Sequence, residues 1–185
     1  SGKGQMGSEW VSEVDKNLMF SVYKRFERLT IENQFCISMI VSLTIHEVLS
    51  ALKLSKIKIK WPNDLHCKGR KFAGMLTEAK VDADSLRSII FGIGLNVNSN
   101  PAKYPKEIQK TATSLYAVGG EELRLNQVAA KVITATQAAY DTCILGNGSE
   151  NLVDAWAPLN SLCGQSVTAI MNNNKIIPFT IFITK

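Results

Sequence analysis

The sequence predicts one α/β domain followed by the beginning of a small all-β unit. Segments with strand-like alternation are interleaved with longer segments of helical periodicity. Of the 185 residues, 45% are hydrophobic and 20% are charged, which is enough for one domain with a real core. After Gly164 the pattern changes to two short strand-like runs around three consecutive asparagines, as in a hairpin.

The first half of the chain carries the expected sheet. Residues 18–23 are apolar and β-branched, whereas residues 31–54 place apolar side chains on more than one helical face and should form a buried helix. The run 57–61 alternates apolar and lysine residues, and Asn63-Asp64 after it indicates a turn. The expected strands are Leu18–Tyr23, Ile57–Trp61, Phe72–Val81 and Ser88–Val97.

The second half is expected to be helical before it returns to strands. Residues 98–121 are loop-like, and Asn126 can cap a helix that runs to about Leu145. A linker at 146–149 and a short helix at 150–156 should follow. The apolar stripe of the long helix is Val128, Val132, Ala135 and Ala139, and the final hairpin comprises Ser166–Met171 and Lys175–Thr184.

Charge and cysteine usage narrow the function classes. The formal net charge of +5 suits an anionic ligand or an acidic partner protein, but the cations are too dispersed for a DNA-binding helix or arm. No two of the four cysteines have metal-ligand spacing, which argues against zinc. Their use is interpreted as that of a protein in a reducing cytoplasm. The longest apolar run, 35–45, has about half the ~20 residues of a membrane span. The glycine-rich opening suggests that further residues precede Ser1 in the natural protein.

The opening segment Gly2-Lys3-Gly4-Gln5-Met6-Gly7 can bring backbone amides close to an anion, with Lys3 adding charge. The alternative is a flexible surface turn. Trp10 directly after it can stack on a purine ring or anchor the end of the loop.

Two further segments carry candidate binding residues. If the expected strands pair in the right register, Lys60 and Lys71 share a face and can stabilise a phosphate and a carboxylate; the alternative is a solvated basic hairpin. Gly92 and Gly94 indicate close approach of a ligand or backbone, or a β-bulge, and Asn96 can contact an adenine edge. No nucleophile with a positioned base is evident, and His46 and His66 are interpreted as structural or solvent-facing.

In their order along the chain and in their residue identities, these segments resemble the signature blocks of biotin–protein ligases. The blocks are Lys60-Trp-Pro-Asn-Asp-Leu65, Gly69-Arg-Lys-Phe-Ala-Gly74 and Gly92-Ile-Gly-Leu-Asn-Val-Asn98. The opening Gly2-x-Gly4-x-x-Gly7-x-x-Trp10 resembles the adenylate-binding loop of the family. The resemblance runs from Gly2 to about Trp156. It implies a mixed sheet backed by helices, related to class II aminoacyl-tRNA synthetases. The catalytic domain would span 1–160, with its N-terminal part missing, and 161–185 would begin an SH3-like β-domain.

The resemblance also implies a set of site residues. Lys71 corresponds to the lysine that contacts the biotin carboxylate and the reacting phosphate, and Lys60 and Asp64 join it as catalytic residues. Trp10 corresponds to the tryptophan beside the adenine, and Asn96 to the asparagine near its edge. Gln5, Met6 and Ser8 stand where the family often has arginines. The other binding residues are Gly2, Lys3, Gly4, Gln5, Asn63, Gly74 and Gly94, and no metal ligand is assigned.

The implied activity is ATP- and Mg²⁺-dependent formation of biotinyl-5'-AMP, followed by transfer of biotin to a lysine of a biotin carboxyl carrier protein. One alternative is a lipoate–protein ligase, although its lysine strand usually lacks the Trp61-Pro62 pair. The other is a biotin-sensing repressor or binding module. Nucleic acid would be a partner only if a DNA-binding domain preceded Ser1, and the choice between monomer and homodimer stays open.

Overall fold

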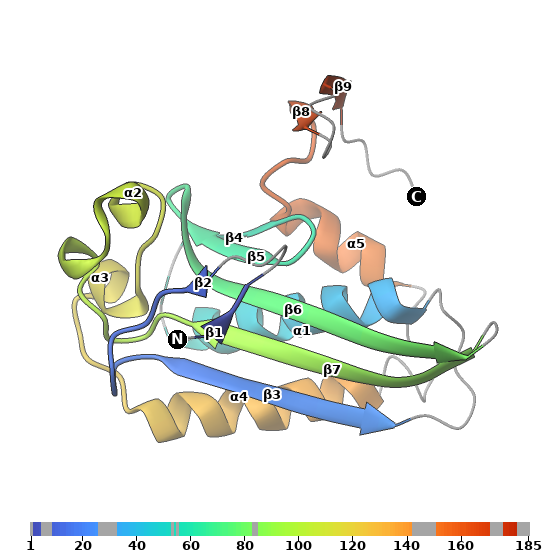
Figure 1. Cartoon of the computed structure of the whole chain (residues 1–185), viewed down its shortest axis with the longest axis horizontal. Helices are drawn as coiled ribbons and strands as arrows, with labels where there is room; N and C mark the ends of the chain where they lie inside the picture. The colour runs from blue at the N-terminus through green and yellow to red at the C-terminus, as the bar shows by residue number, and fades with distance from the viewer. Residues whose placement is uncertain are drawn as a thin grey trace.

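The computed structural model is a two-layer α+β fold, and it describes residues 2–4, 9–25, 33–52, 54, 56–82, 85–141, 151–170 and 176–180. A five-stranded sheet with the order β3-β7-β6-β5-β4 forms one layer, and helices cover one of its faces (Figure 1). All pairings between its strands are antiparallel. The expectation of a mixed sheet is therefore wrong for the described residues, where parallel pairing is limited to two isolated bridges.

The sheet contains a strand that sequence reasoning missed. The segment Asp64–Cys67, interpreted as a turn and connection, forms β5 between the two lysine-bearing strands. The prediction that these two strands pair directly is therefore wrong. The strands of the sheet are β3 (Leu18–Arg25), β4 (Ile57–Lys60), β5 (Asp64–Cys67), β6 (Arg70–Asp82) and β7 (Ser85–Leu95).

A β-bulge at the start of β6 decides which side chains face the core. Leu65 pairs with Ala73 but His66 pairs with Lys71, so Phe72 is an extra residue on β6. Phe72 and Ala73 are both fully buried as a result. The bulge breaks the alternation, and Lys71 and the buried Gly74 both line a cavity on the opposite, open face of the sheet.

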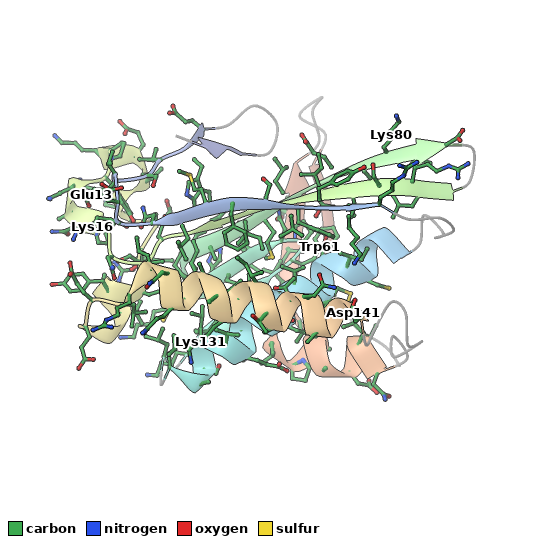
Figure 2. All side chains as sticks on the ribbon, turned by 90° about the horizontal axis from the view of Figure 1, so that it is seen from below. Glu13, Lys16, Trp61, Lys80, Lys131 and Asp141 are labelled. Atoms are coloured by element: carbon green, nitrogen blue, oxygen red, sulfur yellow. The ribbon has the colours of Figure 1, made fainter. Side chains whose placement is uncertain are left out.

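Three helices form the second layer, beneath the sheet and on the side opposite the β1–β2 pair (Figure 2). α1 (Asn33–Ala51) contacts both α4 (Leu125–Tyr140) and α5 (Leu152–Trp156). The apolar stripe expected for α4 is confirmed for the fully buried Val128 and Val132. The core between the layers includes Ile37, Val41, Ile45, Leu49, Ile59, Leu65, Phe72, Ile89, Phe91 and Ile93.

Two predictions about α4 differ from the structure. Its N-cap is Arg124 rather than Asn126, whose side chain instead accepts a hydrogen bond from the Gln127 amide. Arg124 makes no side-chain capping bond, so the helix starts without the expected signal. The expected C-terminal extension of the helix and the linker at 146–149 lie outside the described residues.

The segment between β7 and α4, expected to be a loop, contains three short helices. These are η2 (Pro101–Lys103), α2 (Lys106–Gln109) and α3 (Leu115–Gly119). Ser114 caps α3 by accepting a hydrogen bond from the Ala117 amide, and its own hydroxyl donates to the Ser99 carbonyl. These contacts fix the end of the segment against β7.

The C-terminal part of the chain contacts the sheet at β4, which is an edge strand. Ser161 donates a backbone hydrogen bond to Ile59 on β4, which covers part of that edge strand. The predicted hairpin is present as β8 (Ser166–Ile170) paired with β9 (Ile176–Thr180). An SH3-like domain is not seen within the described residues, and no helix among them is long and apolar enough to cross a membrane.

Candidate functional site

A cavity of about 890 Å³ is lined by the strands of the sheet, by β1 and β2, and by residues 108–112. The short strands β1 (Gly2–Lys3) and β2 (Glu9–Trp10) pair with each other and contribute to its wall. Most of the sequence-predicted site residues line this one cavity: Gly2, Gly4, Trp10, Lys60, Asn63, Asp64, Lys71, Gly74, Gly94 and Asn96. Gln5 and the Lys3 side chain lie outside the described residues.

Lys71 and Asp64 form the charged centre of the cavity. The Lys71 ammonium is 2.7 Å from Oδ1 of Asp64, and the two side chains are 35% and 23% exposed. Burial alone would raise the pKa of the Asp64 carboxyl, but His66 and Lys71 beside it outweigh burial and lower that pKa. Asp64 is therefore a carboxylate that holds the lysine ammonium at a defined place.

Trp10 and Lys71 lie together over two paired glycines. Gly74 and Gly94 are register partners on β6 and β7. A Cβ at Gly94 would be 2.8 Å from Cε2 of Trp10, and a Cβ at Gly74 would be 2.9 Å from Cε of Lys71. The Lys71 ammonium is also 5.3 Å from the centroid of the Trp10 ring, within cation–π range. The two glycines thus make the space that the indole and the lysine stem occupy.

This arrangement resolves the alternatives left open for the two β7 glycines. At Gly94 the close approach is made by the Trp10 ring. At Gly92 a Cβ would meet Leu76 at an ordinary 3.6 Å, so no close approach requires that glycine. The register between β6 and β7 is continuous through both positions, which excludes a β-bulge there.

Segment 111–113 braces the two central residues of the site. The Lys71 amide donates to the Thr111 carbonyl at 2.8 Å, and the Thr113 amide donates back to the Lys71 carbonyl at 2.8 Å. The Asn96 side-chain amide donates to the Thr113 carbonyl at 3.1 Å. The loop-like segment therefore fixes Lys71 and Asn96 from the same side.

Asn63 and Asn96 are both held by backbone contacts. Nδ2 of Asn63 donates to the Met75 carbonyl, and the Met75 amide donates to the Asn63 carbonyl at 3.0 Å. Asn96 is 5% exposed, and its Oδ1 has no hydrogen-bond partner in the described part of the chain. One N–H of the Asn96 amide is therefore already used by Thr113, and Oδ1 is the unmatched atom that a ligand could pair with.

Buried polar atoms without partners gather at this cavity. Within the described residues these include Trp10 Nε1, His66 Nε2 and Asn96 Oδ1, and all three residues line the cavity. A buried polar group that lacks a hydrogen bond costs about 1–3 kcal/mol, so native proteins rarely leave one unmatched without a reason. A polar ligand that forms hydrogen bonds with these atoms is the simplest explanation of why the protein leaves them unpaired.

Sequence reasoning missed several residues of the cavity. His66, interpreted as structural or solvent-facing, lines it beside Asp64 and Lys71, a position that the sequence analysis did not predict. The only available signal was its place two residues after Asp64, which puts both side chains on one face of a strand. His46 on α1 does not line the cavity, and burial lowers its pKa. The other missed lining residues include Met19, Ser21, Leu76, Glu78 and Ile90.

The described residues do not form a metal centre. No group of three His, Cys, Asp or Glu side chains among them is placed to hold an ion. Asp64 is already paired with Lys71, so the protein groups described here do not fit a protein-held Mg²⁺.

Known proteins are similar to this chain in sequence and in architecture. The structure of biotin protein ligase from Aquifex aeolicus in complex with biotin and ATP has a TM-score of 0.79 and 25% identity, covering 97% of this chain and 72% of that one. The bifunctional ligase/repressor BirA of Bacillus subtilis is 29% identical over 140 residues, which is 76% of this chain and 43% of BirA. BirA of Escherichia coli is 28% identical over 176 residues, 95% of this chain and 54% of BirA.

The chain spans about half the length of the curated relatives it matches. The family model for the biotin/lipoate A/B protein ligase family matches residues 1–96, just over half of the chain. That range contains Lys60 and Lys71, the two lysines that line the cavity. It also contains the first two signature blocks and the third block as far as Asn96. The chain therefore belongs to the biotin/lipoate A/B protein ligase family.

Proposed function

We propose that this chain is the catalytic part of a biotin–protein ligase. It forms biotinyl-5'-AMP from biotin and ATP and transfers biotin to a lysine of a biotin carboxyl carrier domain. The observation that carries the proposal is the Lys71 ammonium, fixed at the centre of a large cavity beside unmatched buried polar atoms. Family membership and the biotin and ATP bound to the Aquifex aeolicus relative support it.

Adenylation requires two anions, the biotin carboxylate and the α-phosphate, to approach each other against their repulsion. Lys71 is the group we assign to reduce that repulsion and to stabilise the charge of the transition state, with Lys60 on the same cavity wall. Asp64 positions Lys71 before substrates arrive, through the 2.7 Å ion pair. ATP enters with the Mg²⁺ bound by its own phosphates.

Trp10 and Asn96 are assigned to the purine. The indole of Trp10 offers an aromatic face, and the free Oδ1 of Asn96 is an acceptor that suits the exocyclic amino group of adenine. A loop that contains Gly2, Lys3, Gly4 and Gln5 is assigned to close over the reactants and to shield the adenylate from water.

Residues 161–185 are assigned to the beginning of an SH3-like domain. The β8–β9 hairpin supports this assignment.

Biotin rather than lipoate is the proposed acid. The ureido ring of biotin needs several fixed donors and acceptors, and a site built for them rejects a ligand that lacks them by up to roughly 10⁴-fold. Lipoate carries only a dithiolane ring on its acyl chain and would leave those groups unpaired. The Trp61-Pro62 pair beside Lys60 is the sequence feature that supports biotin.

The test uses the complete natural protein with ATP, Mg²⁺ and either acid. Pyrophosphate exchange reports adenylation, and label on a biotin carboxyl carrier domain reports transfer. We expect exchange and labelling with biotin and at most trace activity with lipoate. Labelling with lipoate alone would reassign the chain as a lipoate ligase, and tight biotin binding with neither reaction would favour a sensor.

A further inference from the structure

His66 is the cavity residue to which the adenylation step gives no role. It lines the cavity from β5, and its register partners are Lys58 on β4 and Lys71 on β6. Its side chain is 14% exposed, and its Nε2 is 3.9 Å from Oδ2 of Asp64, too far for a direct hydrogen bond. Nε2 is buried and has no hydrogen-bond partner among the described residues.

The turn that follows His66 fixes the protonation pattern of its ring. Lys68 and Gly69 both have positive φ, 50° and 78°, as in a two-residue hairpin turn, and this turn brings the Gly69 carbonyl back to the ring. Nδ1 of His66 is 3.2 Å from that carbonyl oxygen. Because a carbonyl oxygen only accepts, Nδ1 carries the proton, and in the neutral ring Nε2 carries the lone pair.

We propose that His66 is the general base for the second half of the reaction, an inference that rests on the proposed function. The neutral amine of the acceptor lysine attacks the acyl carbon of biotinyl-5'-AMP and forms the C–N bond. Nε2 of His66 takes the proton that the amine nitrogen must lose. The C–O bond to the phosphate then breaks, AMP leaves with the electron pair, and the imidazolium returns its proton to water.

The position of His66 suits this step and not the first one. Adenylation releases no proton, so a base is of no use there. In transfer, the acyl carbon is expected beside Lys71, and His66 is the register partner of Lys71 on the neighbouring strand, with Cβ atoms about 5 Å apart. The charged groups that face the ring are Lys58, Lys60, Asp64 and Lys71.

The experiment separates the two half-reactions in the complete natural protein. His66→Asn keeps an amide that can donate to the Gly69 carbonyl but removes the base, and His66→Ala leaves space for added imidazole. His46→Gln is the matched control, because His46 lies outside the cavity. Pyrophosphate exchange measures adenylation. Transfer is measured in a single turnover, from preformed biotinyl-5'-AMP to a carrier domain, between pH 5.5 and 9.

We expect both His66 variants to lose about 10²-fold or more in transfer rate, the usual contribution of a general base, and to lose much less in pyrophosphate exchange. The dependence of the transfer rate on pH should change in both variants, and added imidazole should restore part of the rate of His66→Ala. Wild-type transfer with an unchanged pH profile in His66→Asn would overturn the role, as would equal loss of both half-reactions. If the unsubstituted protein performs no exchange with biotin, the proposed function itself fails.

Discussion

The indole ring of Trp10 lies so close to Gly94 that a methyl group there would be 2.8 Å from Cε2 of the ring. No side chain larger than hydrogen fits at position 94 while Trp10 keeps its place. The glycine of β7 and the tryptophan of β2 are thus one structural unit, although 84 positions separate them in the sequence. Under the proposed function, its integrity should matter for nucleotide binding as well as for stability.

The first prediction follows from this contact. Gly94→Ala should displace the Trp10 ring, and overpacking of this kind costs about 1–3 kcal/mol. We expect the affinity for ATP to fall about tenfold or more, since 1.4 kcal/mol corresponds to a factor of ten. Isothermal titration gives the Kd, and the thermal unfolding midpoint shows whether the fold has changed.

Gly92→Ala is the matched control, on the same strand and the same face. Its Cβ would make only ordinary contact with Leu76, at 3.6 Å. We expect ATP affinity close to that of the natural protein. Equal losses at Gly92 and Gly94 would show that the strand, and not the Trp10 contact, is what the substitutions disturb.

The second prediction concerns Lys71. Lys71→Ala removes a preorganised charge opposite two anions, and loss of one such group commonly costs about 10²–10³ in rate. Pyrophosphate exchange should fall by that factor. Lys80→Ala is the control, because Lys80 lies on the same strand but at its exposed end (Figure 2). Unchanged exchange in Lys71→Ala would exclude the assigned role.

The third prediction is a pH dependence of stability through Asp64. The pKa of its carboxyl is lowered in the folded chain, because His66 and Lys71 outweigh the effect of burial. A group of this kind stabilises the fold above its unfolded pKa, about 3.9, and the stabilisation is lost as the pH falls through the folded pKa. Asp64→Asn should therefore lower the free energy of unfolding at pH 7, and the gap to the natural protein should narrow in acid.

Urea unfolding at several pH values between 3 and 7 measures this gap. Asp82→Asn is the comparison, since Asp82 pairs with Arg87 at the exposed end of β6 and such exposed pairs contribute about 0–1 kcal/mol. A gap for Asp64→Asn that stays constant down to pH 3 would contradict the charge assignment. A narrowing gap would show that Asp64 is ionised and paired in the native state.

Much of the fold follows from sequence because strong periodicity marks its long elements. Strand β3 and helix α1 were predicted close to their observed bounds, since their apolar patterns extend over several turns or pleats. β5 was missed because four residues, Asp64–Cys67, are too few to establish alternation after a turn signal. Local patterns also carry no information about strand order, so the insertion of β5 between the lysine strands was not visible.

The candidate site was predictable in composition but not in geometry. The signature blocks place Lys71, Asp64 and Asn96 in the sequence, yet the bulge at Phe72 determines that Lys71 faces the cavity together with Gly74. A bulge arises from pairing with β5 and has no local signal. The place of His66 in the cavity was not predictable for the same reason, because its surroundings are created by its neighbours on β4 and β6.

The last prediction concerns nucleotide selectivity at Asn96. Nδ2 of Asn96 is committed to the Thr113 carbonyl, which fixes the orientation of the amide and leaves Oδ1 as an acceptor only. An acceptor attracts the exocyclic amino group of adenine and repels the carbonyl oxygen that inosine carries in its place. The natural protein should therefore use ATP in preference to ITP by about tenfold or more, the value of one buried hydrogen bond.

Asn96→Ala should abolish this preference while it also weakens the fold, because the Thr113 carbonyl loses its donor. The ratio of pyrophosphate-exchange rates with ATP and ITP is the appropriate measurement, since a general loss of folded protein lowers both rates equally and leaves their ratio unchanged. Asn63→Ala is the control within the same cavity: the Asn63 amide is tied to Met75 and is assigned no contact with the base, so its ATP preference should persist. A preference for ATP that survives in Asn96→Ala but disappears in Asn63→Ala would assign the adenine to Asn63 instead.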